Sequence, residues 1–187
     1  QGHVKIPESW TEISSGSFSG CNELVTIDIP SNIRAIGTRA FFQARNLVAV
    51  DLPKSVRTIG VYSFYGCTKL TNLVLPDTVS TLGGYSFQGC TSLTAVSIGS
   101  GSELTVLNED TFSGCTSLLE ITIPDGVVTV RDGLCRGCVL LKSVTFGERV
   151  QKIGNQAFEN CDSLTSLSFP ESLLSLGSNT FSGCVSL

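Results

Sequence analysis

The chain has 187 residues, of which 41% are hydrophobic and only 15% charged, and its formal net charge is −4. Globular domains average about 25% charged residues, so disorder driven by charge repulsion is excluded. The acidic balance argues against nucleic acids and anionic membranes as partners, because both select a basic surface. No apolar run approaches the ~18 residues that cross a bilayer.

A single repeat runs along the whole chain. Phenylalanine, cysteine and leucine recur with a step of 23 residues, interrupted by one step of 25. The cysteine positions are Cys21, Cys67, Cys90, Cys115, Cys138, Cys161 and Cys184, with Ala44 in the one vacant place. Three residues before these positions stand Phe18, Phe41, Phe64, Phe87, Phe112, Phe158 and Phe181. Columns of this kind are the signature of a solenoid.

The unit from Cys67 to Gly89 shows the elements expected in each coil. Leu70, Leu73 and Leu75 give an apolar pattern that ends with leucine at alternate positions, which predicts a short strand over 72–75 with Leu73 and Leu75 facing the core. Pro76 ends this strand because it lacks a backbone N–H. The other inward positions of the unit are Val79, Leu82 and Phe87.

No unit of this length can bury both of its faces alone, so neighbouring units must stack. We therefore expect residues 1–187 to form a single domain, a β-rich solenoid of about eight 23-residue coils. Both ends of the chain fall inside a unit, since Val4 matches the strand position of Ile27 and Leu187 is the first core residue of a further unit. This favours a fragment of a longer protein, or ends that a neighbour covers.

The consensus L-x-x-[LV]-x-I-P-x-x-V-x-x-I-G-x-x-[AS]-F-x-G-C resembles the BspA-like (treponemal-type) leucine-rich repeats. It appears nearly complete at Cys67–Gly89 and at Cys161–Gly183. The resemblance covers essentially the whole chain, and it implies a right-handed leucine-rich repeat superhelix. It also implies non-enzymatic roles at cell surfaces, in adhesion and partner binding. The family offers no catalytic residues to transfer to this sequence.

The repeat departs from its pattern in four places. The turn at 42–45 lacks both glycine and cysteine, and residues 99–102 contain the two-residue insertion without a proline. Asn108 and Arg131 replace a turn glycine, and Cys135 takes a phenylalanine position, which leaves a smaller core side chain. Loops that bind partners commonly emerge at such irregularities.

Catalytic and metal sites are not expected. Side chains in the cysteine column should lie ~4.8 Å apart and nearly parallel, which suits buried thiols better than disulfides. Cys135 and Cys138 form a C-x-x-C pair, but no second pair completes a zinc site. The single histidine, His3, lies near one end without the held partner that nucleophilic catalysis requires. The sequence thus predicts no enzyme activity, metal or cofactor.

One candidate for partner binding lies on the strand face. Asp28 and Asp51 share an outward column and should be neighbours, which is unfavourable for like charges. Either Lys5 in the same column offsets this charge, or a partner's arginine or a bound cation does.

A second candidate lies at the turn edge of coils two to four. Phe42 and Tyr65 share one outward column, and Tyr62 and Tyr85 share another, with Arg39 and Arg45 nearby. Tyr, Phe and Arg are enriched at the centres of protein interfaces. The alternative is ordinary edge packing.

We therefore expect a non-catalytic module that binds a protein partner, at the cell surface or secreted, as the family resemblance implies. The alternative is a structural subunit or scaffold locked within a larger assembly. Reduced thiols and the absence of an Asn-x-Ser/Thr glycosylation site agree with an intracellular complex.

Overall fold

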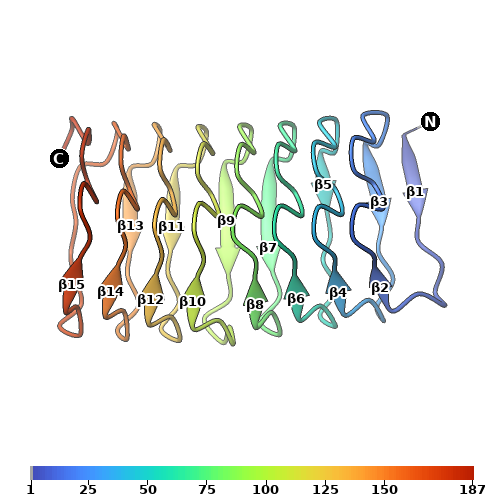
Figure 1. Cartoon of the computed structure of the whole chain (residues 1–187), viewed down its shortest axis with the longest axis horizontal. Coiled ribbons are helices and arrows are strands. Elements are labelled where there is room, and N and C mark those ends of the chain that lie inside the picture. The colour runs from blue at the N-terminus through green and yellow to red at the C-terminus, as the bar shows by residue number, and fades with distance from the viewer. Residues whose placement is uncertain (1) are drawn as a thin grey trace.

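The computed structural model of the chain describes residues 2–187, and this part contains fifteen short strands and no helix. Figure 1 shows the strands in two rows along one axis, with the termini at opposite ends. The first row holds β1 (His3–Lys5), β3 (Thr26–Asp28), β5 (Ala49–Val50), β7 (Asn72–Leu75), β9 (Ala95–Ile98), β11 (Glu120–Thr122) and β13 (Ser143–Thr145). The second row holds β2 (Glu12–Ile13), β4 (Ala35–Ile36), β6 (Thr58–Ile59), β8 (Thr81–Leu82), β10 (Val106–Leu107), β12 (Thr129–Val130), β14 (Lys152–Ile153) and β15 (Ser175–Leu176).

Paired strands are parallel and offset by one repeat, so that His3 lies opposite Thr26 in the first row and Glu12 opposite Ala35 in the second. The predicted β-solenoid of about eight coils is confirmed. The strand expected at 72–75 is confirmed as β7.

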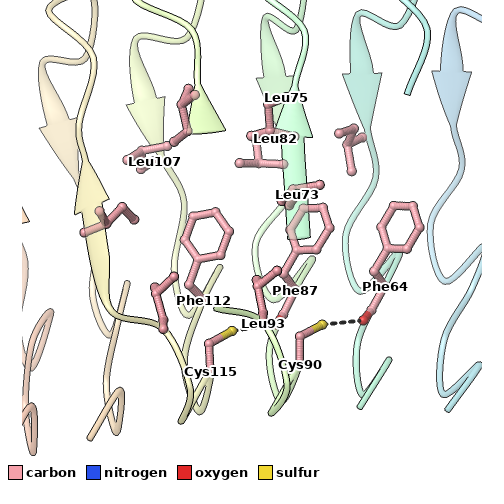
Figure 2. Packing of buried hydrophobic residues seen from close by; sticks show 14 of the residues in the cluster. Phe64, Leu73, Leu75, Leu82, Phe87, Cys90, Leu93, Leu107, Phe112 and Cys115 are labelled. Carbon is pink, nitrogen blue, oxygen red and sulfur yellow. Dashed lines mark hydrogen bonds between the residues drawn. The ribbon is translucent and has the colours of Figure 1, made fainter. Parts of the chain in front are cut away.

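The core runs the length of the stack, and Figure 2 shows part of it between Phe64 and Cys115. Leu73 and Leu75 are buried, as are the three other predicted inward residues, Val79, Leu82 and Phe87. The phenylalanine column forms a face-to-face stack, with ring centroids 4.9 Å apart between Phe41 and Phe64 and 5.1 Å apart between Phe64 and Phe87. Each coil thus covers the apolar face of the next.

The interior cysteines are free thiols that pack as small apolar side chains, and all of them except Cys135 donate one hydrogen bond to a backbone carbonyl. The Cys90 thiol donates to the carbonyl oxygen of Phe64 in the preceding coil at 3.3 Å (Figure 2), and Cys67 donates to Phe41 in the same way at 3.2 Å. The predicted ladder of buried thiols is confirmed for the inner coils. The prediction of burial is wrong for Cys21, which is exposed at the N-terminal end of the stack.

The insertion at 99–102 interrupts both rows. The sheets end at β8 and β9, and new sheets begin at β10 and β11, while the first row is also divided between β5 and β7. In the preceding coil the backbone N–H of Gly83 donates to Ile59 at 2.8 Å. Across the interruption, the side-chain amide of Asn108 donates to the Leu82 carbonyl at 2.7 Å instead. Asn108, which replaces a turn glycine, therefore bridges the two halves of the solenoid.

The core volume lost by having cysteine at position 135 in place of phenylalanine is filled by a neighbouring side chain. Cys135 is buried in the phenylalanine column, as predicted. Its neighbour Leu134 is also fully buried, in a column where other coils have serine, alanine or threonine. One large and one small residue have exchanged columns, which keeps the interior close-packed.

The Leu73→Ala substitution should lower the free energy of unfolding by roughly 2–5 kcal/mol, because it leaves a cavity in a fully packed column. Denaturant unfolding followed by circular dichroism would measure the loss. Val74→Ala is the matched control on the same strand: Val74 is 63% exposed, so its truncation should change stability by about 0.5 kcal/mol or less. Equal effects of the two substitutions would contradict the inward assignment of Leu73.

Thiol reactivity should separate Cys21 from the inner cysteines. Burial raises the pKa of the Cys67 thiol to about 12, and burial also raises the pKa values of Cys90 and Cys115. Since the thiolate is the reactive form, iodoacetamide at pH 8 should alkylate Cys21 in the native protein and leave these three unmodified, with mass spectrometry as the readout. All 8 cysteines should react in denaturant. Rapid native alkylation of Cys90 would contradict the burial of the ladder.

Candidate functional site

Each coil makes two tight turns after its second-row strand, and both turns use residues with positive φ. The first of these turn columns consists of Gly16, Arg39, Tyr62, Tyr85, Asp110, Gly133, Gln156 and Asn179. The second consists of Gly20, Gln43, Gly66, Gly89, Gly114, Gly137, Asn160 and Gly183. Glycine adopts this left-handed conformation without steric cost, which explains why it dominates the second column.

Three successive coils place large side chains in the first turn column. Arg39, Tyr62 and Tyr85 have φ values of 55°, 57° and 59°. The left-handed conformation costs roughly 1–2 kcal/mol for a residue with a Cβ, and Gly16 and Gly133 make the same turn without it. Strained residues of this kind cluster at functional sites. Asp110, Gln156 and Asn179 also have positive φ in this column, so the run from Arg39 to Tyr85 is distinguished by the size of its side chains.

The aromatic edge comprises Arg39, Phe42, Tyr62, Tyr65 and Tyr85. The two pairs predicted from the repeat are confirmed as face-to-face stacks, Phe42 on Tyr65 at 5.0 Å and Tyr62 on Tyr85 at 4.8 Å between centroids. Tyr62 also meets Tyr65 edge-on at 5.7 Å, which joins the pairs into one cluster. All four rings are half-buried, so their edges face solvent.

Of the two arginines predicted to lie at this edge, Arg39 contacts the aromatic rings. The Arg39 guanidinium lies 5.7 Å from the Phe42 centroid and 5.5 Å from that of Tyr62. A cation over ring faces at such distances is attracted by the ring quadrupole. Arg45 is exposed, and its backbone N–H lies 3.4 Å from Asn22 Oδ1. Among residues 2–187, the cation–ring contacts at this edge come from Arg39.

The acidic candidates lie apart from the aromatic edge, on the first strand row. Asp28 lies opposite Lys5 in the β1–β3 register, but the ion pair that forms joins Asp28 Oδ2 to His3 Nε2 at 3.4 Å. His3 Nδ1 also lies 2.9 Å from Thr26 Oγ1. Both partners of the ion pair are at least half exposed, so it contributes little to stability. Asp51 is exposed directly after β5.

Within residues 2–187 there is no cluster of three or more His, Cys, Asp or Glu side chains arranged to hold a metal ion. The same residues include no helix long and apolar enough to cross a membrane. The Cys135 thiol of the C-x-x-C pair is buried, and burial raises its pKa, which opposes the thiolate that metal binding and redox exchange require.

Solved leucine-rich repeat proteins share this architecture. A protein from Bacteroides ovatus is 28% identical, with a TM-score of 0.85 over 99% of this chain and 53% of its own. The Treponema pallidum leucine-rich repeat protein is 29% identical, with a TM-score of 0.77 over 88% of this chain and 78% of its own. This chain therefore spans about half the length of the Bacteroides protein. No curated protein sequence matches the chain significantly.

The model of the BspA type leucine-rich repeat region matches residues 2–118 and 97–187, with 6 copies of the repeat. Together these ranges cover the described chain, in agreement with the stacked coils, the phenylalanine column and the thiol ladder. The chain belongs to the BspA type leucine-rich repeat family.

Proposed function

We propose that the chain is a non-catalytic module that binds a protein partner through the aromatic edge, at the cell surface or in secreted form. Leucine-rich repeat domains generally mediate protein–protein binding. The observation that carries the proposal is the joint presence of two stacked ring pairs and three side chains held at positive φ. Large side chains are not needed to build this turn, because the other coils make it with Gly16, Asp110, Gly133, Gln156 or Asn179.

The chemistry of the edge suits a protein partner. Its rings are fixed by stacking, so little side-chain entropy remains to be lost on binding. Tyrosine presents an apolar ring and a polar hydroxyl, and it is over-represented among the residues that dominate binding energy. The location at the cell surface or outside the cell is part of the proposal and rests on the family resemblance.

The double substitution Phe42→Ala with Tyr65→Ala should weaken partner capture roughly tenfold or more, because truncating two hot-spot aromatics removes over ~1.4 kcal/mol of binding free energy. The melting temperature should stay within a few degrees, since both rings are only half-buried. The measurement is quantitative capture by the immobilised protein from surface fractions and medium of the source cells.

Glu159→Ala is the matched control. Glu159 occupies the same turn column as Phe42 and Tyr65 and is also half-buried, but it lies four coils beyond Tyr65. Its substitution should leave capture unchanged. Unchanged capture by the double variant would make the aromatic edge a packing feature only. Recovery of the native protein solely in an intracellular complex of constant stoichiometry would support the alternative function, a structural subunit.

A further inference from the structure

A groove of about 740 Å³ begins where the stacked rings end. Tyr85, the last ring of the aromatic edge, forms part of its lining. The acidic residues of its lining are Glu109, Asp110 and Asp132, and the basic ones are Arg131 and Lys152. The groove is therefore polar, with one more acidic than basic side chain, and it is continuous with the aromatic edge.

The three carboxylates differ in how far their charge is already compensated. Asp110 is nearly buried and accepts a hydrogen bond from Arg136 Nη2 at 2.7 Å. Asp132 accepts two hydrogen bonds from Asn155, at 2.8 and 3.0 Å. Glu109 lies 3.9 Å from an Arg131 guanidinium that is 57% exposed. Such a distant and exposed pair is weak, so Glu109 is the carboxylate best placed to take a new cation.

Glu109 and Tyr85 belong to the same wall of the groove. The Tyr85 N–H donates to the Glu109 carbonyl at 2.9 Å. The Glu109 carboxylate lies over Gly84, where an added Cβ would stand only 2.9 Å from Oε1. The pKa of the Tyr85 hydroxyl is raised by burial and then by the Asp110 charge, with smaller contributions from Tyr62 and Glu109. The carboxylates of Asp110 and Glu109 therefore lie beside the ring, together with the Arg136 guanidinium that pairs with Asp110 and opposes the rise in this pKa.

A ring beside a carboxylate favours a cationic neighbour. Tyr62 covers one face of the Tyr85 ring, and the coil that carries Glu109 follows on the other side. The face of an aromatic ring is negative and attracts a guanidinium or ammonium group. At the opposite end of the same cluster, the chain's own Arg39 guanidinium already lies over Tyr62. The aromatic edge therefore has a cation at one end and a groove with an accessible carboxylate at the other.

We propose that this groove binds an arginine side chain of the protein partner, stacked on Tyr85 and paired with Glu109. This inference rests on the proposed function, because the same partner would contact the aromatic edge. Arginine fits better than lysine, since its planar guanidinium can stack on a ring and donate two parallel hydrogen bonds to one carboxylate. In the bound state the arginine replaces the exposed Arg131 as the partner of Glu109.

The test uses small blocked amino acids as probes of the groove. N-acetyl-arginine amide, its neutral isostere N-acetyl-citrulline amide and the anionic N-acetyl-glutamate amide are titrated into ¹⁵N-labelled protein. The arginine probe should give saturable shifts at the amides of Gly84, Tyr85 and Glu109, and the other two probes should not. Glu109→Gln should weaken its binding roughly threefold, the size expected for one partly exposed ion pair. Glu148→Gln, which changes an exposed glutamate outside the groove, should leave it unchanged.

Three results would overturn the inference: equal shifts with citrulline, shifts with the glutamate probe alone, or no saturable shift with arginine. The glutamate result would instead identify Arg131 and Lys152 as an anion site. Failure here is distinguishable from failure of the proposed function, because the probes report on the groove and partner capture reports on Phe42 and Tyr65. If the arginine probe binds but the double variant captures its partner normally, the groove is supported as a binding site and the aromatic edge is not.

Discussion

The structure depends on one constraint, the constant register between neighbouring coils. Parallel strands pair with an offset of one repeat, and the thiols of the cysteine column, such as Cys67 and Cys90, donate to a carbonyl of the preceding coil. A slip of one residue would turn the inward side chains of a strand to solvent, so the register is held along the whole core. Identical positions of successive coils therefore lie side by side. A surface such as the aromatic edge arises when one residue choice is repeated in adjacent coils.

The insertion shows how much disturbance this constraint tolerates. Neither strand row pairs across residues 99–102, and the centroids of Phe87 and Phe112 are 5.8 Å apart, wider than the 5.1 Å between Phe64 and Phe87. The core nevertheless continues, because both rings are fully buried and the Asn108 amide takes over a backbone hydrogen bond. The fold thus accepts local irregularity where a side chain can replace the lost main-chain contact.

Sequence periodicity predicted the inward columns, β7 and both ring pairs, because those features depend only on which residue types recur at which spacing. It did not predict the positive φ of Arg39 and Tyr62, since a side-chain pattern does not report backbone conformation directly. The ion pair of Asp28 with His3 depends on side-chain rotamers that a column assignment does not specify. The groove was not predicted because its wall combines residues from several coils, from Tyr85 to Gly154.

The energetics of the aromatic edge agree with the proposal that its residues serve binding. Three side chains at positive φ cost roughly 1–2 kcal/mol each. A stacked pair contributes about 0.5–1.5 kcal/mol beyond burial, and an exposed cation–ring contact about 0.5–1 kcal/mol. The internal contacts therefore do little more than offset the strain. Glycine at these turns would build the coil equally well, as Gly133 does. The turn column runs from Arg39 through Tyr62 and Tyr85 to Asp110, so cation, rings and carboxylate follow one another along the axis. A partner that lies along this column would meet apolar ring edges first and negative charge next.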